Sequence, residues 1–123
     1  MTIKEISQTE FEAKIAVAAE TDWARLAACI DSRWGSVGTT GNTERVPFVG
    51  VVHKDPRLIC WLRDVFGGTT STDSADELSW SHTGERAVDI IRHIIQFMLI
   101  KGGQAETVLA YHELGNSKLE DQT

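Results

Sequence analysis

Residues 26–37 constrain the fold of this chain more than any other segment, because a run of small side chains leads directly into a tight turn. At the spacing of one helix side, the residues are Ala24, Ala27, Ala28 and Asp31. Because alanine carries only a methyl group, this face lets another backbone approach closely, either in the chain's own core or elsewhere. The Gly35-Ser36 pair that follows indicates a turn. The segment therefore predicts a closely packed helix over residues 22–33.

The bulk composition is that of one ordinary globular domain. The chain has 123 residues, of which 41% are hydrophobic and 24% charged. Its longest apolar stretch is interrupted by Arg92, His93 and Gln96, so no membrane span is predicted. The first residues lack the apolar centre of an export signal, which favours a cytoplasmic protein. Cys29 and Cys60 fall in apolar helical patterns and are expected to be buried, reduced thiols.

The formal net charge of -6 bears on the choice of partner. Proteins that bind nucleic acids usually present a basic face, because neutralising phosphates supplies much of their affinity. An acidic chain can still carry a local basic patch, but its charge argues against a broad one.

Periodicity and capping residues predict helices that alternate with pairs of strands. Helices are expected at residues 9–20, 22–33, 56–66, 84–100 and 104–114. Strand pairs are expected at residues 35–41 with 45–53, and at residues 69–72 with 77–83. Asp55, Thr83 and Gly115 supply start and stop signals. We divide the chain into an N-terminal helical extension (1–20), one domain (21–115) and a flexible tail (116–123).

This order is typical of an α+β fold, in which an antiparallel sheet of hairpins is covered by helices on one face. Four stretches also carry a resemblance to a known family. They are residues 26–37, the strand 49–54 that enters Asp55-Pro56, residues 58–68, and residues 78–87 followed by 99–106. In order and spacing they resemble one half of a LAGLIDADG homing endonuclease, an α-ββ-α-ββ-α unit.

The resemblance implies a function and a partner. The signature helix of this family joins two halves, so a chain with one motif is expected to form a homodimer through Ala24, Ala27, Ala28 and Asp31. The two sheets would form a saddle on double-stranded DNA, with strands in the major groove. An acid at the end of each signature helix binds a divalent metal, here Mg²⁺, and a lysine that matches Lys101 lies close to the catalytic centre.

The acidic position is filled differently in this chain. Counting forward from Leu26 places the family's acid at Arg33, and counting back from Gly35 places it at Trp34. Neither side chain can ligate Mg²⁺, which takes oxygen ligands. Asp31 is the only nearby carboxylate, and it is either structural or a substitute metal ligand. Arg33 could neutralise a DNA phosphate directly, or it could lie in solvent, where its charge suits the helix dipole.

The strands expected to face DNA are rich in serine and threonine and poor in basic residues. The candidates for DNA contact are Arg33, Arg45, His53, Lys54, Ser81 and His82. Hydroxyl groups can bond phosphates and bases, but they release no counterions. We therefore expect weak binding with a shallow salt dependence.

Three functions remain open from the sequence. The first is a homing-endonuclease-like DNA-binding protein whose metal-dependent cleavage is reduced or lost. The second is an active homing endonuclease whose metal site is rearranged around Asp31. The third is a non-catalytic protein-interaction module, a scaffold of phage or intron origin that meets its partner through an acidic, hydroxyl-rich surface.

Overall fold

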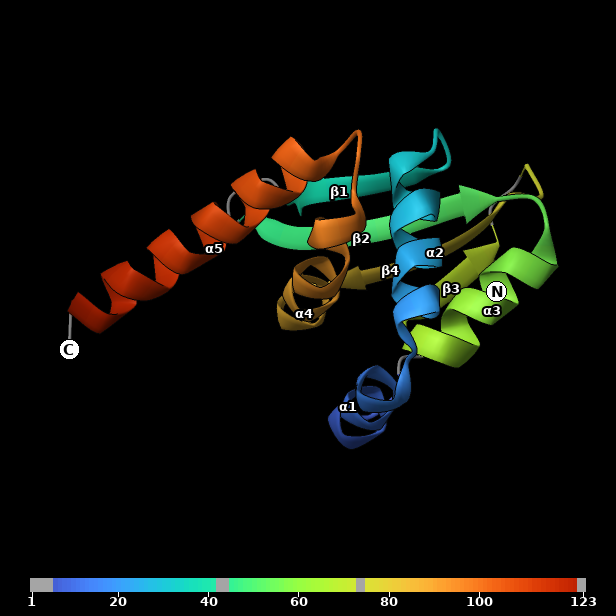
Figure 1. Cartoon of the computed structure of the whole chain (residues 1–123), viewed down its shortest axis with the longest axis horizontal. Coiled ribbons are helices and arrows are strands. Elements are labelled where there is room, and N and C mark those ends of the chain that lie inside the picture. The colour runs from blue at the N-terminus through green and yellow to red at the C-terminus, as the bar shows by residue number, and fades with distance from the viewer. Residues whose placement is uncertain (1–5, 42–44, 73–74, 122–123) are drawn as a thin grey trace.

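The computed structural model describes residues 6–41, 45–72 and 75–121, and its elements follow the expected order (Figure 1). The helices are α1 (Gln8–Val17), α2 (Glu20–Asp31), α3 (Pro56–Phe66), α4 (Glu85–Ile94), the 3-10 helix η1 (Ile95–Phe97) and α5 (Gly102–Asp121). The strands are β1 (Gly35–Thr40), β2 (Val46–His53), β3 (Thr69–Thr72) and β4 (Leu78–Thr83). The α+β class and the alternation of hairpins with helices are confirmed. Within the described residues, no helix has both the length and the apolar character that a membrane span needs.

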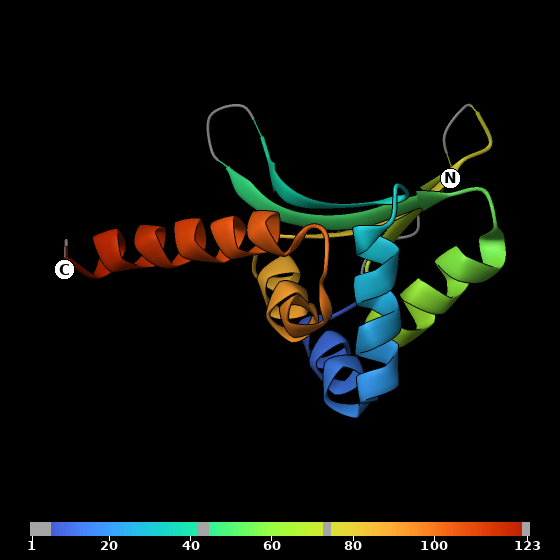
Figure 2. The same cartoon turned by 45° about the horizontal axis from the view of Figure 1, so that its top comes forward.

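The strands form one antiparallel sheet in the order β1-β2-β4-β3. Val37 in β1 lies opposite Val49 in β2, and Val51 in β2 lies opposite Trp80 in β4. These side chains share the face that the helices cover. The sheet curves so that its two ends rise away from the helices, which leaves the opposite face open and concave (Figure 2).

The core fills the space between the sheet and the helices. Its largest fully buried apolar side chains include Trp80, Phe66, Leu26 and Ile30. Complete burial of such a side chain is worth about 1.5–3 kcal/mol relative to exposure. Trp80 also satisfies its one polar group, because its indole N–H donates to the carbonyl oxygen of Gly67.

Helix α1 closes one end of this core, although the sequence suggested an extension beside the domain. Phe11 is 1% exposed and meets the ring of His82 edge to face, with centroids 5.0 Å apart. Lys14 Nζ donates to the carbonyl oxygen of Asp64 in α3 at 2.6 Å. The packing therefore joins α1 to the same body as the sheet.

Three details differ from the expectations. The long helix predicted to residue 100 ends at Ile94 and passes through η1 into an extended residue, Met98. Helix α5 continues past Gly115, which keeps a negative φ, because one glycine costs a helix only about 1 kcal/mol. Cys60 lies on the outer side of α3 and is exposed, while Cys29 is half-buried; both thiols are free.

Candidate nucleic-acid interface

Helix α2 divides its residues between the core and the surface. Leu26 and Ala27 have no exposed surface, whereas Ala28 is exposed and Ala24 is half-buried. This corrects one part of the expected dimer contact, because the methyl group of Ala27 is already enclosed by the chain's own core. Ala24 and Ala28 remain accessible to a second chain.

The turn from α2 into β1 requires a glycine. A Cβ atom at Gly35 would lie 2.3 Å from the Cα of Ile30 and 2.4 Å from the carbonyl oxygen of Cys29. Both are backbone atoms, which cannot move aside as the end of a side chain could. Ser32 Oγ donates to the same Cys29 oxygen at 2.6 Å. These contacts set the position of Trp34, which lies between Ser32 and Gly35.

Asp31, for which the sequence left a structural role and metal ligation open, is engaged in the fold. Its Oδ2 accepts the backbone N–H of Leu99 at 2.7 Å, and its Oδ1 accepts those of Ile100 and Lys101 at 3.2 and 2.8 Å. Burial raises the pKa of this carboxyl group, but the three hydrogen bonds and the charge of Lys101 outweigh it, so the pKa lies below its ordinary value. Asp31 thus fastens the end of α2 to the segment before α5.

Lys101, expected near the catalytic centre, takes part in the same connection. Its Nζ donates to the carbonyl oxygens of Ile30, Ser32 and Gly35 at 2.8, 2.6 and 2.6 Å. An ammonium group has three N–H donors, so all of them are used. Because the carbonyls of Ile30 and Ser32 lie at the negative end of the α2 dipole, the lysine caps the helix through a tertiary contact, and its bond to Gly35 ties the cap to β1.

The groups at this end of α2 do not suit a divalent metal. Mg²⁺ and Ca²⁺ take oxygen ligands, above all carboxylates. Both oxygens of Asp31 already accept N–H groups, and the next positions hold Arg33 and Trp34. In the part of the chain that the structure describes, no group of three or more His, Cys, Asp or Glu side chains could hold a metal ion.

Instead of a carboxylate, this end of the helix carries a stacked cluster of Arg33, Trp34 and His53. The Cζ of Arg33 lies 4.4 Å from the centroid of the Trp34 ring, and that ring meets His53 edge to face with centroids 4.8 Å apart. The carbonyl oxygen of Trp34 accepts the N–H of Val52 at 2.8 Å, which ties the turn to β2. Arg33 is exposed, and the two rings are half-buried.

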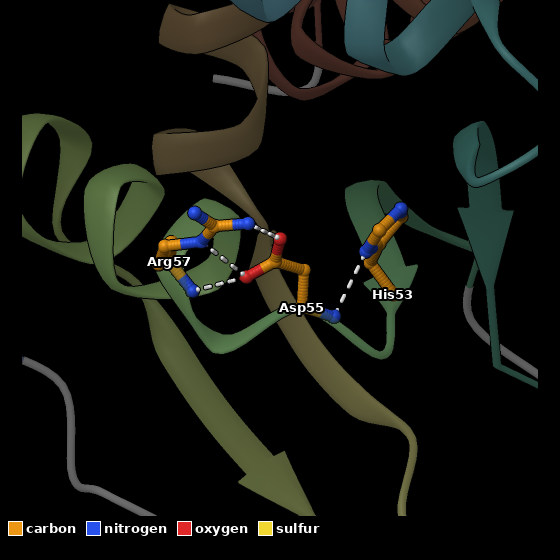
Figure 3. Close-up of polar contacts among 3 residues, drawn as sticks. All are labelled: His53, Asp55 and Arg57. Carbon is orange, nitrogen blue, oxygen red and sulfur yellow. Dashed lines mark hydrogen bonds and ion pairs between the residues drawn. The ribbon is translucent and has the colours of Figure 1, made fainter.

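The start of α3 holds His53 in turn (Figure 3). The N–H of Asp55 donates to His53 Nδ1 at 2.9 Å, so the neutral ring carries its proton on Nε2. The carboxylate of Asp55 caps α3 and pairs with Arg57 at 2.8 Å. The side-chain and backbone hydrogen bonds from Arg57 lower the pKa of Asp55 to about 2. Asp55 therefore stays ionised and paired at neutral pH.

Among the strand residues that the structure describes, the open face of the sheet carries no ionisable side chain. Its positions are Ser36, Gly38 and Thr40 in β1, Val46, Phe48, Gly50 and Val52 in β2, Ser79, Ser81 and Thr83 in β4, and Thr69 and Ser71 in β3. The Oγ atoms of Ser71 and Ser79 share a hydrogen bond of 2.6 Å. The ring of Phe48 lies across Gly50. The face is thus neutral, rich in hydroxyl groups and partly apolar.

The predicted basic contacts lie at the ends of β2 and not on this face, and His53 shares the side of β2 that carries Val49 and Val51. Lys54 is exposed directly after β2 and next to His53 of the stacked cluster. Arg45 is exposed at the other end of β2 and lines a groove of about 410 Å³ between β1 and α5. Ser81 lies on the open face itself. The structure therefore brings Arg33, His53 and Lys54 together and leaves Arg45 apart.

His82 is not accessible to DNA, which corrects its place among the predicted contacts. Its side chain is 0% exposed and lies between Phe11 and Trp80 on the face that the helices cover. Its Nε2–H donates to the carbonyl oxygen of Phe66 at 2.9 Å. Because strand residues alternate between faces, the neighbours Ser81 and His82 must point in opposite directions.

The contact between Trp34 and His53 was not foreseen from the sequence. It depends on the pairing of β1 with β2, in which Gly35 lies opposite Val51. The alternation of Val37, Val49 and Val51 sets this register. It is therefore the sequence signal from which the contact between the two rings could have been predicted.

These features define the LAGLIDADG homing-endonuclease half-domain fold, a sheet with one open face and a signature helix that ends beside it. The chain is similar in structure to the homing endonuclease I-CvuI in complex with its target in the presence of Ca, with a TM-score of 0.69 and 16% sequence identity over 80% of this chain and 71% of that chain. A second structure, I-CvuI with an I-CreI target in the presence of Mg and with its DNA not cleaved, gives a TM-score of 0.67 and 14% identity over 74% and 65% of the two chains. No family profile and no curated protein sequence matches the chain.

Proposed function

We propose that this chain binds double-stranded DNA as a homodimer, with the open face of its sheet against the duplex and without metal-dependent cleavage at Asp31. One combined observation supports the proposal. The chain has the fold of proteins that hold DNA targets, and the carboxylate at the end of its signature helix is bonded to three backbone N–H groups.

The contact surface would combine hydroxyl groups with flanking cations. Ser81 and the other hydroxyl side chains of the open face can donate to and accept from phosphates and base edges. Arg45 and Lys54 lie at opposite ends of β2, so they could contact phosphates on either side of the groove that the strands enter. Since the net charge is -6, we expect the affinity to be low and to require low salt.

Exposed apolar side chains beside α2 support the homodimer. Leu99 is 93% exposed and Ile100 is 76% exposed, yet their N–H groups are held by Asp31. Such a fixed apolar pair in solvent is typical of a contact surface. Together with Ala24 and Ala28, it would form the patch that a second copy covers.

A binding titration tests the first part of the proposal. Fluorescence anisotropy with a pool of random-sequence duplexes should show binding at low salt that weakens as salt rises. Lys54→Gln should lower the steepness of this salt dependence by about one unit per chain, because one phosphate contact is lost. Arg92→Gln, an exposed position on α4, is the matched control and should bind as the wild type does. The absence of binding at low salt would refute the proposal.

A cleavage assay tests the second part and separates it from an active endonuclease with a rearranged centre. With Mg²⁺ and the same duplex pool, we expect no nicking or cutting. Robust cutting that disappears in Asp31→Asn, while the variant stays folded by circular dichroism, would show that Asp31 serves a metal after all.

A protein partner is the second candidate, and the neutral open face favours it. Val52 is 40% exposed and Phe48 is half-buried on this face, which suits contact with another protein as well as with DNA. Tight duplex binding at low salt would exclude this candidate. If DNA does not bind, a protein partner on the same face becomes the leading hypothesis.

A further inference from the structure

The stacked cluster lies at the end of the signature helix, where the carboxylate of an active homing endonuclease is expected. We propose that it is a metal-free site for one phosphodiester of the DNA backbone, in which Arg33 binds the phosphate and Trp34 and His53 hold it in place. This inference rests on the proposed DNA binding, and it names Arg33 as the residue that contacts the DNA backbone at the end of α2.

Arg33 is free to accept an anion. Its guanidinium group stacks on Trp34 through one face, so the N–H donors along its edges are not used by the ring. No ion-pair partner for Arg33 is found among the described residues. The two carboxylates closest to the cluster along its contacts are engaged, since Asp31 accepts three N–H groups and Asp55 pairs with Arg57.

The charges around the cluster favour an anion rather than a metal. The cations here are Arg33, Lys54, Arg57 and Lys101, and the carboxylates are Asp31, Asp55 and Glu77, which directly precedes the Leu78 that pairs with His53. This end of α2 therefore has a small excess of positive charge in a chain whose net charge is -6. That excess favours a phosphate over a divalent cation.

His53 offers a second donor. Its Nδ1 accepts the N–H of Asp55, so the remaining ring nitrogen, Nε2, carries the proton. The edge contact with Trp34 and the bond to Asp55 fix the ring from two sides. His53 thus adds an N–H donor to the cluster, on the ring that contacts Trp34, without needing to be charged.

The cluster is organised before any ligand arrives. The turn at Gly35 and the bond from Val52 to Trp34 hold the indole, and the indole limits the freedom of Arg33. A side chain that is already ordered loses less entropy on binding. The planar guanidinium fork also matches two phosphate oxygens, which an ammonium group cannot do in the same way.

The chain supplies a matched control in Arg25. It lies within α2, is exposed, and stacks on an indole as Arg33 does, with its Cζ 5.3 Å from the ring of Trp61. Arg33→Gln and Arg25→Gln therefore remove the same charge and the same kind of stacking, one just after the end of α2 and the other in the middle of that helix. Both side chains are on the surface, so both variants should fold, which circular dichroism checks.

The test measures duplex affinity across a range of salt concentrations. Loss of one phosphate contact per chain lowers the salt slope by about 0.9, or about 1.8 for a homodimer. We expect this reduction in Arg33→Gln and no change in Arg25→Gln. Arg33→Lys should keep the slope and bind more weakly, because it keeps the charge and loses the fork. If the cluster is instead a site for inorganic phosphate, then inorganic phosphate should compete with the duplex, whereas sodium chloride of equal ionic strength should not.

Each outcome decides the inference. The phosphate site is overturned if the wild type binds DNA and Arg33→Gln keeps the wild-type salt slope. It is also overturned if Arg33→Gln and Arg25→Gln reduce the salt slope equally. The proposed DNA binding survives either result. Competition by inorganic phosphate alone, with no effect of Arg33→Gln on the slope, would show an ion site unrelated to DNA. If the wild type does not bind duplex DNA at all, the proposed function and the inference both fall.

Discussion

At the scale of single residues, two opposite charges join the end of α2 to the start of α5. Asp31 accepts the N–H groups of Leu99, Ile100 and Lys101, and Lys101 donates to the carbonyl oxygens of Ile30, Ser32 and Gly35, at the end of α2 and the start of β1. Each side chain thus provides hydrogen-bond partners for backbone groups where a helix ends or begins. The pair gives the carboxylate and the lysine at these positions a role in the fold.

Lys101→Met should destabilise the fold. Its ammonium group satisfies three carbonyl oxygens in a half-buried place, so we expect a loss of about 2 kcal/mol in the free energy of unfolding. Urea denaturation followed by tryptophan fluorescence measures it. Lys54→Met, at an exposed position, is the control and should be nearly neutral. Equal stability of the two variants would contradict the cap.

Asp31→Asn should destabilise the protein in a way that depends on pH. The folded pKa of Asp31 lies below its unfolded value, so its contribution is complete above about pH 4 and is lost as pH falls through the folded pKa. We expect a loss of about 1–2 kcal/mol near neutral pH, because an amide cannot accept all three N–H groups. The difference between wild type and variant should shrink below about pH 4. A stability difference between wild type and Asp31→Asn that stays constant across this pH range would contradict a stabilising role for the ionised Asp31 carboxylate.

Sequence reasoning singled out both residues and left a structural role for Asp31 open, but it gave no hydrogen-bond partner for either residue. Their partners are backbone groups at the far end of the chain, and no side-chain pattern reveals such bonds. Arg33 and Trp34 were found by counting positions, whereas the edge contact with His53 needed the strand register.

At the scale of elements, the join between α2 and β1 depends on the close approach of two backbones. Gly35→Ala would place a methyl group against Ile30 and Cys29, and we expect a loss of about 3 kcal/mol or more. Gly38→Ala is the matched control in the same strand, since a Cβ there meets nothing within 4 Å. Thermal unfolding of both variants checks this, and equal melting temperatures would show that the turn can open without cost.

Alternation in β4 could have assigned both of its faces. Leu78, Trp80 and His82 alternate with Ser79, Ser81 and Thr83, and the first set packs toward the helices. Grouping His82 with Ser81 ignored that period of two. Helix ends were harder to predict, because the end of α4 at Ile94 is set by a chain path that carries residues 99–101 to Asp31.

At the scale of the whole molecule, two surfaces are left for partners. One is the open concave face of the sheet, and the other is α2 with the exposed apolar residues Leu99 and Ile100 beside it. The order of elements was predictable, since each helix start and strand pair leaves a local signal. The inclusion of α1 in the core was not, because burial of Phe11 depends on contacts across the chain.

Ile100→Lys should weaken self-association. The side chain is 76% exposed beside α2, so charge there should disrupt an interface and leave the monomer folded. Sedimentation velocity over a range of concentrations measures the shift toward monomer. Leu114→Lys, at a 56% exposed position in α5, is the control for added charge. If both variants associate as the wild type does, the dimer surface lies elsewhere.

The most direct test of the whole account is the stoichiometry of the protein on DNA. Sedimentation equilibrium of the wild type with a short fluorescent duplex at low salt and with Mg²⁺ measures the mass of the complex and the integrity of the DNA together. The account predicts two chains on each intact duplex. A solution in which protein and duplex sediment independently, or in which the duplex is cut, would contradict it.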